Sequence, residues 1–311
     1  MTTVTQELPL YGGLPDGAWA DVKGLRTWWT AAGEGPPVVL VYGGNFGPPA
    51  MGGGDGANQW DACFAGLAER HRVIAYDRPG MGWTDAPPTD EDYTMAFVVD
   101  HLLEFIESLE CGPVSLIGHS RGGYITTRAA LLRQDLVRTV TVINSGTLSP
   151  GVGTNASALS RSDAGADARA RMRRTLEIYC NHNEQAVSED WIDTKLRLLQ
   201  APGHIEAVRR IERRELLLTL FYPALERDKR ETLAWLAEGR LQRPMQIIWG
   251  LNDPTAVLDL GRTLLELIVA HERRTRLDVI SNCGHFPHRE HPAWFVDVVQ
   301  TFLSEVERDD A

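Results

Sequence analysis

A serine between two glycines is the first feature of the sequence that could do chemistry. Ser120 is the centre of residues 118–122, GHSRG, which fit the pattern G-x-S-x-G. An apolar run precedes it and a helical pattern follows, and in that context the pattern marks a nucleophile on a sharp strand-to-helix turn. The flanking positions need glycine because the turn presses them against neighbouring backbone. We therefore predict that Ser120 is a nucleophile at the positive end of a helix.

A serine nucleophile needs a base and a group that orients the base. His285 lies in NCGHFP, residues 282–287, directly after an apolar run and before a helical pattern. Loops at the carboxyl ends of strands are where open α/β sheets meet their ligands, so we predict His285 as the base. Asp253 follows the run at residues 245–249 and is predicted to orient and charge-stabilise the imidazole. Asp259 is the alternative carboxylate.

Short apolar, β-branched runs alternate with longer amphipathic stretches along most of the chain. The runs are residues 37–42, 72–76, 114–118, 139–143, 245–249 and 275–280. The amphipathic stretches are residues 58–70, 95–110, 122–133, 257–271 and 292–307. This alternation is typical of a parallel sheet covered by helices on both faces. Residues 25–31 are expected to add antiparallel edge strands.

The alternation stops between residues 149 and 240. That segment opens with SPGVGTNASALSRSDAGADARA and continues as helical patterns rich in Arg, Leu and Glu. We therefore predict an α-helical cap inserted between two sheet strands. The predicted domains are the first part of an α/β core at residues 1–148, the helical cap at 149–240, and the second part of the core at 241–311.

The most glycine-rich loop of the chain, YGGNFGPPAMGGGDGAN at residues 42–58, follows the first parallel strand. It lacks the GK[ST] of a phosphate-binding loop, and no G-x-G-x-x-G opens a helix there. A flexible linker does not fit inside the order of sheet elements. We predict that the loop supplies one backbone N–H to a developing oxyanion and that Arg121 supplies the other. Gly44 is the first choice and Asn45, one residue along, is the alternative.

Three residues of this loop are predicted to contact the substrate. They are Asn45, Phe46 and Asn58. Residues 51–56 are expected to form an extended loop near the mouth of the pocket.

Composition limits the partners of this 311-residue chain. Its formal net charge is −11, which disfavours nucleic acid and anionic membranes, because phosphate binding needs clustered Lys and Arg. Neither a secretory signal nor a membrane-spanning stretch is recognisable, so we expect a cytoplasmic protein.

The four cysteines form no CxxC pair and are expected to be free thiols. They are Cys63, Cys111, Cys180 and Cys283. A small molecule is the expected partner, and a homodimer is left open.

The candidate residues occur in the chain order Ser120, Asp253, His285, which is the order of the α/β-hydrolases. With the glycine-rich loop and DRPGMG at residues 77–82, the sequence resembles the α/β-hydrolase superfamily over residues 37–142 and 244–303. The resemblance implies a mostly parallel central sheet flanked by helices, with a helical cap inserted between strands. It also implies chemistry that needs neither a metal nor an organic cofactor.

Within the superfamily, the sequence most resembles the meta-cleavage product hydrolases, which cut a C–C bond beside a carbonyl. The resemblance rests on Asn58 after the Gly/Pro loop, on INSGTL at residues 143–148, and on HFP at residues 285–287 followed by Glu290 and Pro292.

Three positions depart from the pattern of that group. His119 stands where the group commonly has Asn, and Phe286 where it commonly has Trp. Both are predicted to contact the substrate, although His119 could instead fill the flank of the turn. A cap arginine that receives the substrate corresponds loosely to Lys195, and Lys does not replace Arg at a bidentate carboxylate site.

Two further segments are interpreted as structural. The spacing of His285, His288 and His291 fits no metal motif, so residues 288–292 are expected to be a surface lead-in to the last helix, with Glu290 near its N-terminus. DRPGMGWTD, residues 77–85, is expected to be a tight turn in which Asp77 bonds locally.

The leading functional hypothesis is a serine hydrolase of a small, mostly apolar carbonyl compound. An ester, a lactone, a thioester or a vinylogous diketone would suit the residues. Two alternatives stay open: a triad enzyme that performs acyl transfer, ring closure or cofactor-free oxygenation, and a ligand-binding protein on a hydrolase scaffold.

Overall fold

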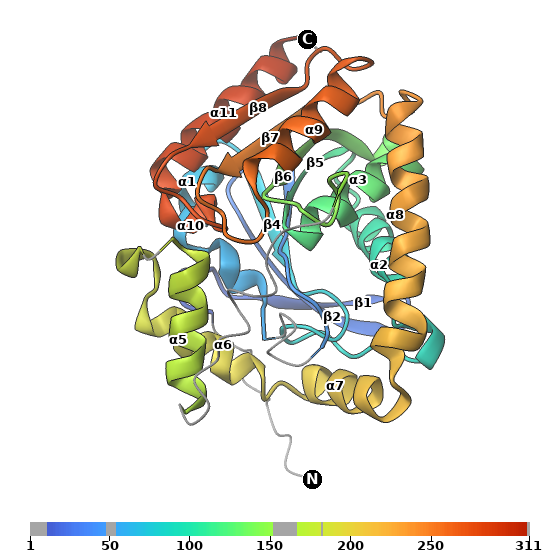
Figure 1. The fold of residues 1–311 in the computed structure, drawn as a ribbon, viewed down its shortest axis with the longest axis vertical. Helices are drawn as coiled ribbons and strands as arrows, with labels where there is room; N and C mark the ends of the chain where they lie inside the picture. Colours follow the sequence, from blue (N-terminus) through green and yellow to red (C-terminus); the bar gives the residue numbers. More distant parts are fainter. Residues whose placement is uncertain (1–10, 48–53, 152–166, 182, 310–311) are drawn as a thin grey trace.

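The computed structural model describes residues 11–47, 54–151, 167–181 and 183–309. Its centre is an eight-stranded sheet in the order β1-β2-β4-β3-β5-β6-β7-β8 (Figure 1). The first two strands pair antiparallel with each other and with β4, and the remaining pairs are parallel. The strands are β1 Ala18–Val22, β2 Leu25–Ala32, β3 Pro37–Val41, β4 Arg72–Tyr76, β5 Val114–His119, β6 Val137–Ile143, β7 Met245–Gly250 and β8 Arg276–Ile280.

Helices cover both faces of this sheet. The main helices of the core are α1 Asp61–Ala68, α2 Met95–Ser108, α3 Arg121–Leu132, α9 Leu258–Val269, α10 Pro287–Glu290 and α11 Pro292–Asp309. Figure 1 shows α1 and α11 on one side of the sheet and α2 and α3 on the other. This division follows from right-handed crossovers, because β3 to β4 runs in one direction along the sheet and β4 to β5 to β6 in the opposite one.

The strand order therefore places a topological switch between β3 and β5. The chain leaves β3 toward α1 on one face and leaves β5 toward α3 on the other. The two loops diverge at the carboxyl edge, and ligands of open α/β sheets bind in the crevice that such a divergence leaves. The glycine-rich loop and Ser120 are the residues at these two strand ends.

Between β6 and β7, every element of the described residues is helical. The elements are α5 Ala168–Tyr179, α6 Glu189–Leu198, α7 Pro202–Arg214, the π-helical turn Leu217–Phe221, α8 Tyr222–Ala237 and the short 3₁₀ turn Glu184–Ala186. The α5 and α6 helices share a small hydrophobic cluster that includes Trp191 and, from the core, Phe286. The α8 helix instead packs on α2, α3 and α9. The exact limits of the domains stay a prediction, and residues 152–166 lie outside the described ones.

The predicted fold is confirmed in its main features. The apolar runs correspond to β3 to β8, and β3, β4, β5 and β7 are almost wholly buried, as strands covered on both faces must be. The antiparallel edge of the sheet, predicted at residues 25–31, is a hairpin of two strands, β1 and β2. The strand β1 was not identified from the sequence. All four cysteines are free. Within the described residues, none of the helices has the length and apolar character to cross a membrane.

Candidate active site

Ser120 lies on a strained turn between β5 and α3. Its backbone has φ 53° and ψ −120°, a conformation that L-residues rarely adopt. A Cβ on Gly118 would lie 2.3 Å from the Gly122 carbonyl oxygen, and a Cβ on Gly122 would lie 2.0 Å from that of Val41. Both positions therefore require glycine, as predicted. The turn is fastened by Ser145, whose hydroxyl donates to the Ser120 carbonyl at 2.6 Å.

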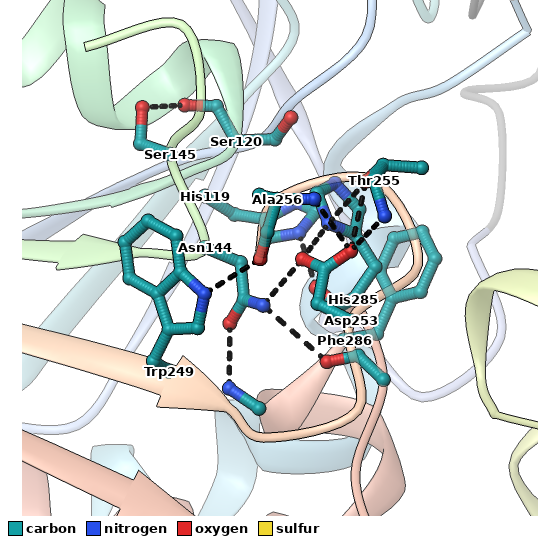
Figure 2. A network of polar contacts seen from close by, with 12 residues as sticks. His119, Ser120, Asn144, Ser145, Trp249, Asp253, Thr255, Ala256, His285 and Phe286 are labelled. Atoms are coloured by element: carbon teal, nitrogen blue, oxygen red, sulfur yellow. Dashed lines mark hydrogen bonds and ion pairs between the residues drawn. The ribbon is translucent and has the colours of Figure 1, made fainter. Parts of the chain in front are cut away.

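The structure brings His285 and Asp253 together. Nδ1 of His285 lies 2.6 Å from Oδ2 of Asp253, and the carboxylate side chain is fully buried (Figure 2). The other oxygen, Oδ1, accepts hydrogen bonds from the backbone N–H of Thr255 at 2.7 Å and of Ala256 at 3.0 Å. Burial raises the pKa of Asp253, but the charge of His285 and these donors outweigh it and hold the pKa below its usual range. The carboxylate is thus kept ionised beside the imidazole.

Ser120 and His285 are not joined by a hydrogen bond in this structure. Asp253 occupies Nδ1 of His285, and within the described residues nothing accepts from or donates to Nε2. The Ser120 hydroxyl also makes no hydrogen bond to a described residue, and Ser120 is partly exposed. His119, the residue before Ser120, packs against His285, with ring centroids 4.7 Å apart. Catalytic hydrogen bonds are often open in unliganded enzymes and form with substrate, so the lack of this bond does not exclude the pair.

Asn144 supports Asp253 and was not singled out as a site residue from the sequence. Its Nδ2 donates to Oδ2 of Asp253 at 2.5 Å, and its Oδ1 accepts from the Gly250 N–H at 3.1 Å. It has φ 45°, a left-handed conformation that Asn tolerates better than most residues. Its place directly after β6, between the strands that carry Ser120 and Asp253, is the signal that could have identified it.

The loop that carries His285 is fixed from two sides. Glu290 accepts the N–H groups of Gly284 at 2.8 Å and of Phe286 at 2.9 Å. From the helical insertion, the Tyr179 carbonyl accepts the His285 N–H at 2.7 Å. A Cβ on Gly284 would lie 2.0 Å from that carbonyl oxygen, so only glycine lets the end of α5 approach so closely. The position of His285 therefore depends on both the core and the insertion.

His119 supports this loop rather than facing open space. It is 1% exposed, and its Nε2 lies 2.8 Å from the His285 carbonyl oxygen while its Nδ1 lies 3.2 Å from Oε1 of Gln59. Burial lowers the pKa of His119 well below the usual value, so the ring is neutral and donates from one nitrogen only. If Nε2 donates to the His285 carbonyl, Nδ1 accepts only when the Gln59 amide turns its NH₂ group toward it. Because both ring nitrogens face protein atoms, the geometry favours the alternative that His119 fills the flank of the turn, and its contact with a substrate stays a prediction.

The glycine-rich loop passes close to Ser120. A Cβ on Gly43 would lie 2.8 Å from Cβ of Ser120. The guanidinium of Arg78 donates to the carbonyls of Gly43 at 2.5 Å and Gly44 at 3.2 Å, which turns these oxygens away from the site. Asp77 bonds the neighbouring Trp83 N–H, as expected locally, and also Tyr11 and Ala57, which are distant in sequence. DRPGMGWTD therefore holds the loop as well as forming a turn.

Two backbone N–H groups remain candidates for the loop's half of an oxyanion hole. No described group accepts a hydrogen bond from the N–H of Gly44, Asn45 or Arg121. The N–H of Phe46, by contrast, is occupied by Oδ1 of Asn45 at 2.9 Å. The choice between Gly44 and Asn45 stays a prediction, and residues 51–53 of the predicted mouth loop lie outside the described ones.

The other predicted substrate contacts lie in different surroundings. Phe46 is buried against Tyr93 and Phe221, with ring centroids 5.3 and 5.4 Å away. Phe286 is buried against Trp191, at 5.2 Å, in the cluster that joins core and insertion. Asn58 is buried, and neither polar atom of its side chain has a hydrogen-bond partner. Its contact with a substrate stays a prediction.

The expectation that residues 288–292 form a surface lead-in was wrong. His288 is 0% exposed, and no described residue forms a hydrogen bond with either of its ring nitrogens. Its ring lies among aromatic rings, with centroids 4.6 Å from Trp60 and 4.8 Å from His119. The polar segment HREH, residues 288–291, forms a buried turn. Its charged side chains Glu290 and Arg289 are satisfied by hydrogen bonds to buried backbone groups. Among the described residues, no cluster of His, Cys, Asp or Glu could hold a metal ion.

Lys195, the residue loosely aligned with a substrate-binding cap arginine, already has a partner. Its ammonium forms an ion pair with Asp55, and the two side chains are 7% and 9% exposed. This pair joins α6 to the loop before the 3₁₀ turn Ala57–Trp60. The charge of Lys195 is therefore neutralised within the protein.

Comparison with known proteins agrees with this geometry. A sequence profile of the alpha/beta hydrolase family matches residues 49–298. The chain belongs to this family. The predictions of the α/β-hydrolase fold and of a hydrolase are thereby confirmed.

The relatives also confirm the likeness to the meta-cleavage product hydrolases. A 2-hydroxymuconate semialdehyde hydrolase of Pseudomonas sp. (strain CF600) is 27% identical over 286 residues, which cover 91% of this chain and 92% of that protein. A 2-hydroxy-6-oxo-2,4-heptadienoate hydrolase of Pseudomonas putida is 26% identical over 285 residues, with 90% and 94% covered. The structure of the meta-cleavage product hydrolase of Pseudomonas fluorescens IP01 superposes with a TM-score of 0.73 at 23% identity, covering 94% of this chain and 98% of that one.

Proposed function

We propose that this hydrolase uses a Ser120-His285-Asp253 triad to cleave a small, mostly apolar carbonyl compound. One observation carries the proposal: the buried, ionised Asp253 accepts from Nδ1 of His285 at 2.6 Å and so leaves Nε2 free to act as a base. The nucleophile is supported by the strained turn of Ser120 and by its place at the N-terminus of the 12-residue helix α3.

The proposed reaction has two halves. Nε2 of His285 takes the proton of the Ser120 hydroxyl as Oγ bonds to the carbonyl carbon, and the leaving group departs with that proton. Water then gives a proton to His285 and attacks the acyl carbon, which releases the acid and restores Ser120. The N–H groups of Arg121 and of Gly44 or Asn45 hold the transient oxyanion, and each such donor is typically worth about 3 kcal/mol. No cofactor enters these steps.

The substrate class is proposed more broadly than the relatives' names. Two relatives are named as hydrolases of oxodienoates and one as a hydrolase of 2-hydroxymuconate semialdehyde, which favours C–C cleavage beside a carbonyl. The same residues would cleave an ester, a lactone or a thioester. Acyl transfer and ring closure would use the same triad and differ only in what accepts the acyl group. Cofactor-free oxygenation would instead consume O₂ as a co-substrate and transfer no acyl group.

The test is a turnover screen of p-nitrophenyl esters, lactones and dienoic ketones. Wild-type protein is expected to turn over at least one class, with release of the free acid. Ser120→Ala and His285→Ala should each lower kcat by about 10⁴-fold or more while the circular dichroism spectrum is unchanged. Near-normal turnover by folded Ser120→Ala would overturn the nucleophile. Acid release replaced by transfer to an added alcohol would favour the acyltransferase alternative.

A further inference from the structure

Arg121 carries a positive charge into the candidate site, beside the nucleophile. It is the residue directly after Ser120, and its guanidinium carbon lies 5.6 Å from the centroid of Phe221. Tyr222, at the start of α8, is close enough to raise the pKa of Arg121. The side chain therefore runs from the nucleophile turn to the underside of the helical insertion.

The charge of Arg121 has no partner of opposite sign. Within the described residues, no carboxylate forms an ion pair with it, and its named neighbours are aromatic rings and a phenol. Burial lowers the pKa of Arg121, since the charged form loses water without gaining a carboxylate, and the nearby charge of Arg78 acts in the same direction. An enclosed cation without a counter-ion is costly unless something supplies the missing charge.

The other enclosed cations near the site have protein partners. Lys195 pairs with Asp55, and Arg78 donates to the carbonyls of the glycine-rich loop. Arg289 pairs with Asp61 and donates to the Asn58 carbonyl at 2.9 Å. Arg78 also pairs with no carboxylate among the described residues, but its guanidinium bonds backbone carbonyls. Arg121 differs because, within the described residues, none of its five guanidinium N–H donors bonds a carbonyl or a carboxylate.

The surroundings of Arg121 also belong to the reaction centre. Burial raises the pKa of Tyr179, the charge of Asp253 adds to this and that of Arg121 opposes it. The ring centroid of Tyr179 lies 5.2 Å from that of His285. Phe221 contacts Phe46 of the glycine-rich loop at 5.4 Å. Arg121 is partly accessible, as Ser120 is, so a ligand bound at Ser120 can reach it.

From this geometry we propose that Arg121 is the carboxylate receptor of the site, and that the natural substrate carries a carboxylate a short distance from the carbonyl that Ser120 attacks. The proposal rests on the proposed function, which it makes more specific. The planar guanidinium can hold a carboxylate through two parallel N–H···O bonds. The substrate would supply the negative charge that the fold omits, while the apolar rings of Phe46, Phe221 and Tyr179 enclose the rest.

The experiment compares matched pairs of substrates in matched variants. The substrates are mono-p-nitrophenyl esters of linear dicarboxylic acids with two to four methylenes, each paired with the same ester whose free carboxylate is a carboxamide. The ratio of kcat/KM within each pair measures discrimination by charge. For at least one length, wild-type protein should prefer the carboxylate, and Arg121→Gln should lower the ratio by about ten- to a hundredfold. Arg121→Lys should retain part of the preference, because the positive charge remains but the planar guanidinium that makes two parallel hydrogen bonds is lost.

Arg128→Gln is the control for the loss of a positive charge from α3. Arg128 lies on the same helix and also contacts α8, through Thr232 and Glu231, but it lies two turns beyond the nucleophile. Its ratio should equal that of the wild type. If Arg121→Gln changes both rates of a pair equally, as a purely structural contact with Phe221 and Tyr222 would, the proposal is overturned.

A binding measurement tests the receptor role of Arg121 separately from the proposed hydrolase activity. Calorimetric titration of Ser120→Ala with each ester measures affinity without turnover. The carboxylate should bind at least tenfold more tightly than its carboxamide, and Ser120→Ala/Arg121→Gln should lose that difference. Charge-dependent binding without any wild-type turnover would contradict the hydrolase proposal and leave Arg121 as the receptor. The absence of any charge preference in Ser120→Ala at every length would overturn the receptor itself.

Discussion

His288 offers a prediction whose sign is opposite to that of most buried substitutions. Its ring is fully buried among Trp60, His119, Phe286 and Phe295, and neither nitrogen has a partner. Burial lowers the pKa of His288 well below its usual value, and the charge of Arg289 acts in the same direction. We expect His288→Leu and His288→Phe to remove an acid sensitivity of the fold.

The magnitude follows from proton linkage. An unfolded histidine takes up a proton below about pH 6.5, whereas the buried His288 does not. The unfolded state therefore binds more protons, so this stability is present above pH 6.5 and is lost as the pH falls. The loss is about 1.4 kcal/mol per pH unit, or about 2 kcal/mol by pH 5. At neutral pH, replacing an unpaired polar ring by an apolar side chain should be close to neutral, and Phe costs more than Leu if the pocket is overfilled.

Urea denaturation at about pH 7.5 and pH 5.0 gives the free energy of unfolding at each pH for wild type and both variants. The informative quantity is the change in this free energy between the two pH values, because a packing cost does not depend on pH and cancels. Wild type should lose about 2 kcal/mol more than either variant, with equal m-values. An equal loss in all three proteins would show that His288 protonates freely in the folded state, and would refute the reasoning.

The remaining predictions concern the support of the triad and the attachment of the helical insertion. Asn144→Gly removes the donor to Asp253 but keeps the left-handed backbone, so we expect kcat to fall about ten- to a hundredfold with little change in KM. Asn144→Ala should show the same kinetics and a free energy of unfolding lower by about 1 kcal/mol more; unchanged kcat in both would show that Asp253 does not need Asn144. Lys195→Met should cost about 3 kcal/mol of unfolding free energy, because it leaves Asp55 buried without its partner. Asp55→Asn/Lys195→Met should regain most of that loss in urea denaturation, and additive losses would contradict a coupled pair.

The residues with the strongest backbone constraints were the most predictable from sequence. Gly118 and Gly122 mark a turn that no residue with a Cβ can form, and they identify Ser120 without knowledge of the fold. The strands were recognisable because their burial on both faces makes them continuously apolar. His285 and Asp253 followed from their places after such strands.

The supporting residues were harder to predict because their roles depend on contacts between distant segments. Asn144 and Glu290 act on residues that the fold brings beside them, and their side chains resemble ordinary loop and helix residues in the sequence. The surface interpretation of residues 288–292 was wrong because polarity alone indicates exposure, whereas His288 is enclosed by aromatic side chains from three other segments. The pairing of Lys195 with Asp55 likewise spans 140 residues.

The most direct test of the central claim is the covalent labelling of Ser120. A small fluorophosphonate reacts with a serine that a neighbouring base activates, and intact-mass spectrometry counts the adducts. We predict one adduct per chain, located on Ser120 by peptide mapping, absent from Ser120→Ala and formed far more slowly in His285→Ala. An adduct that persists in Ser120→Ala, or labelling that is equally fast without His285, would contradict the triad.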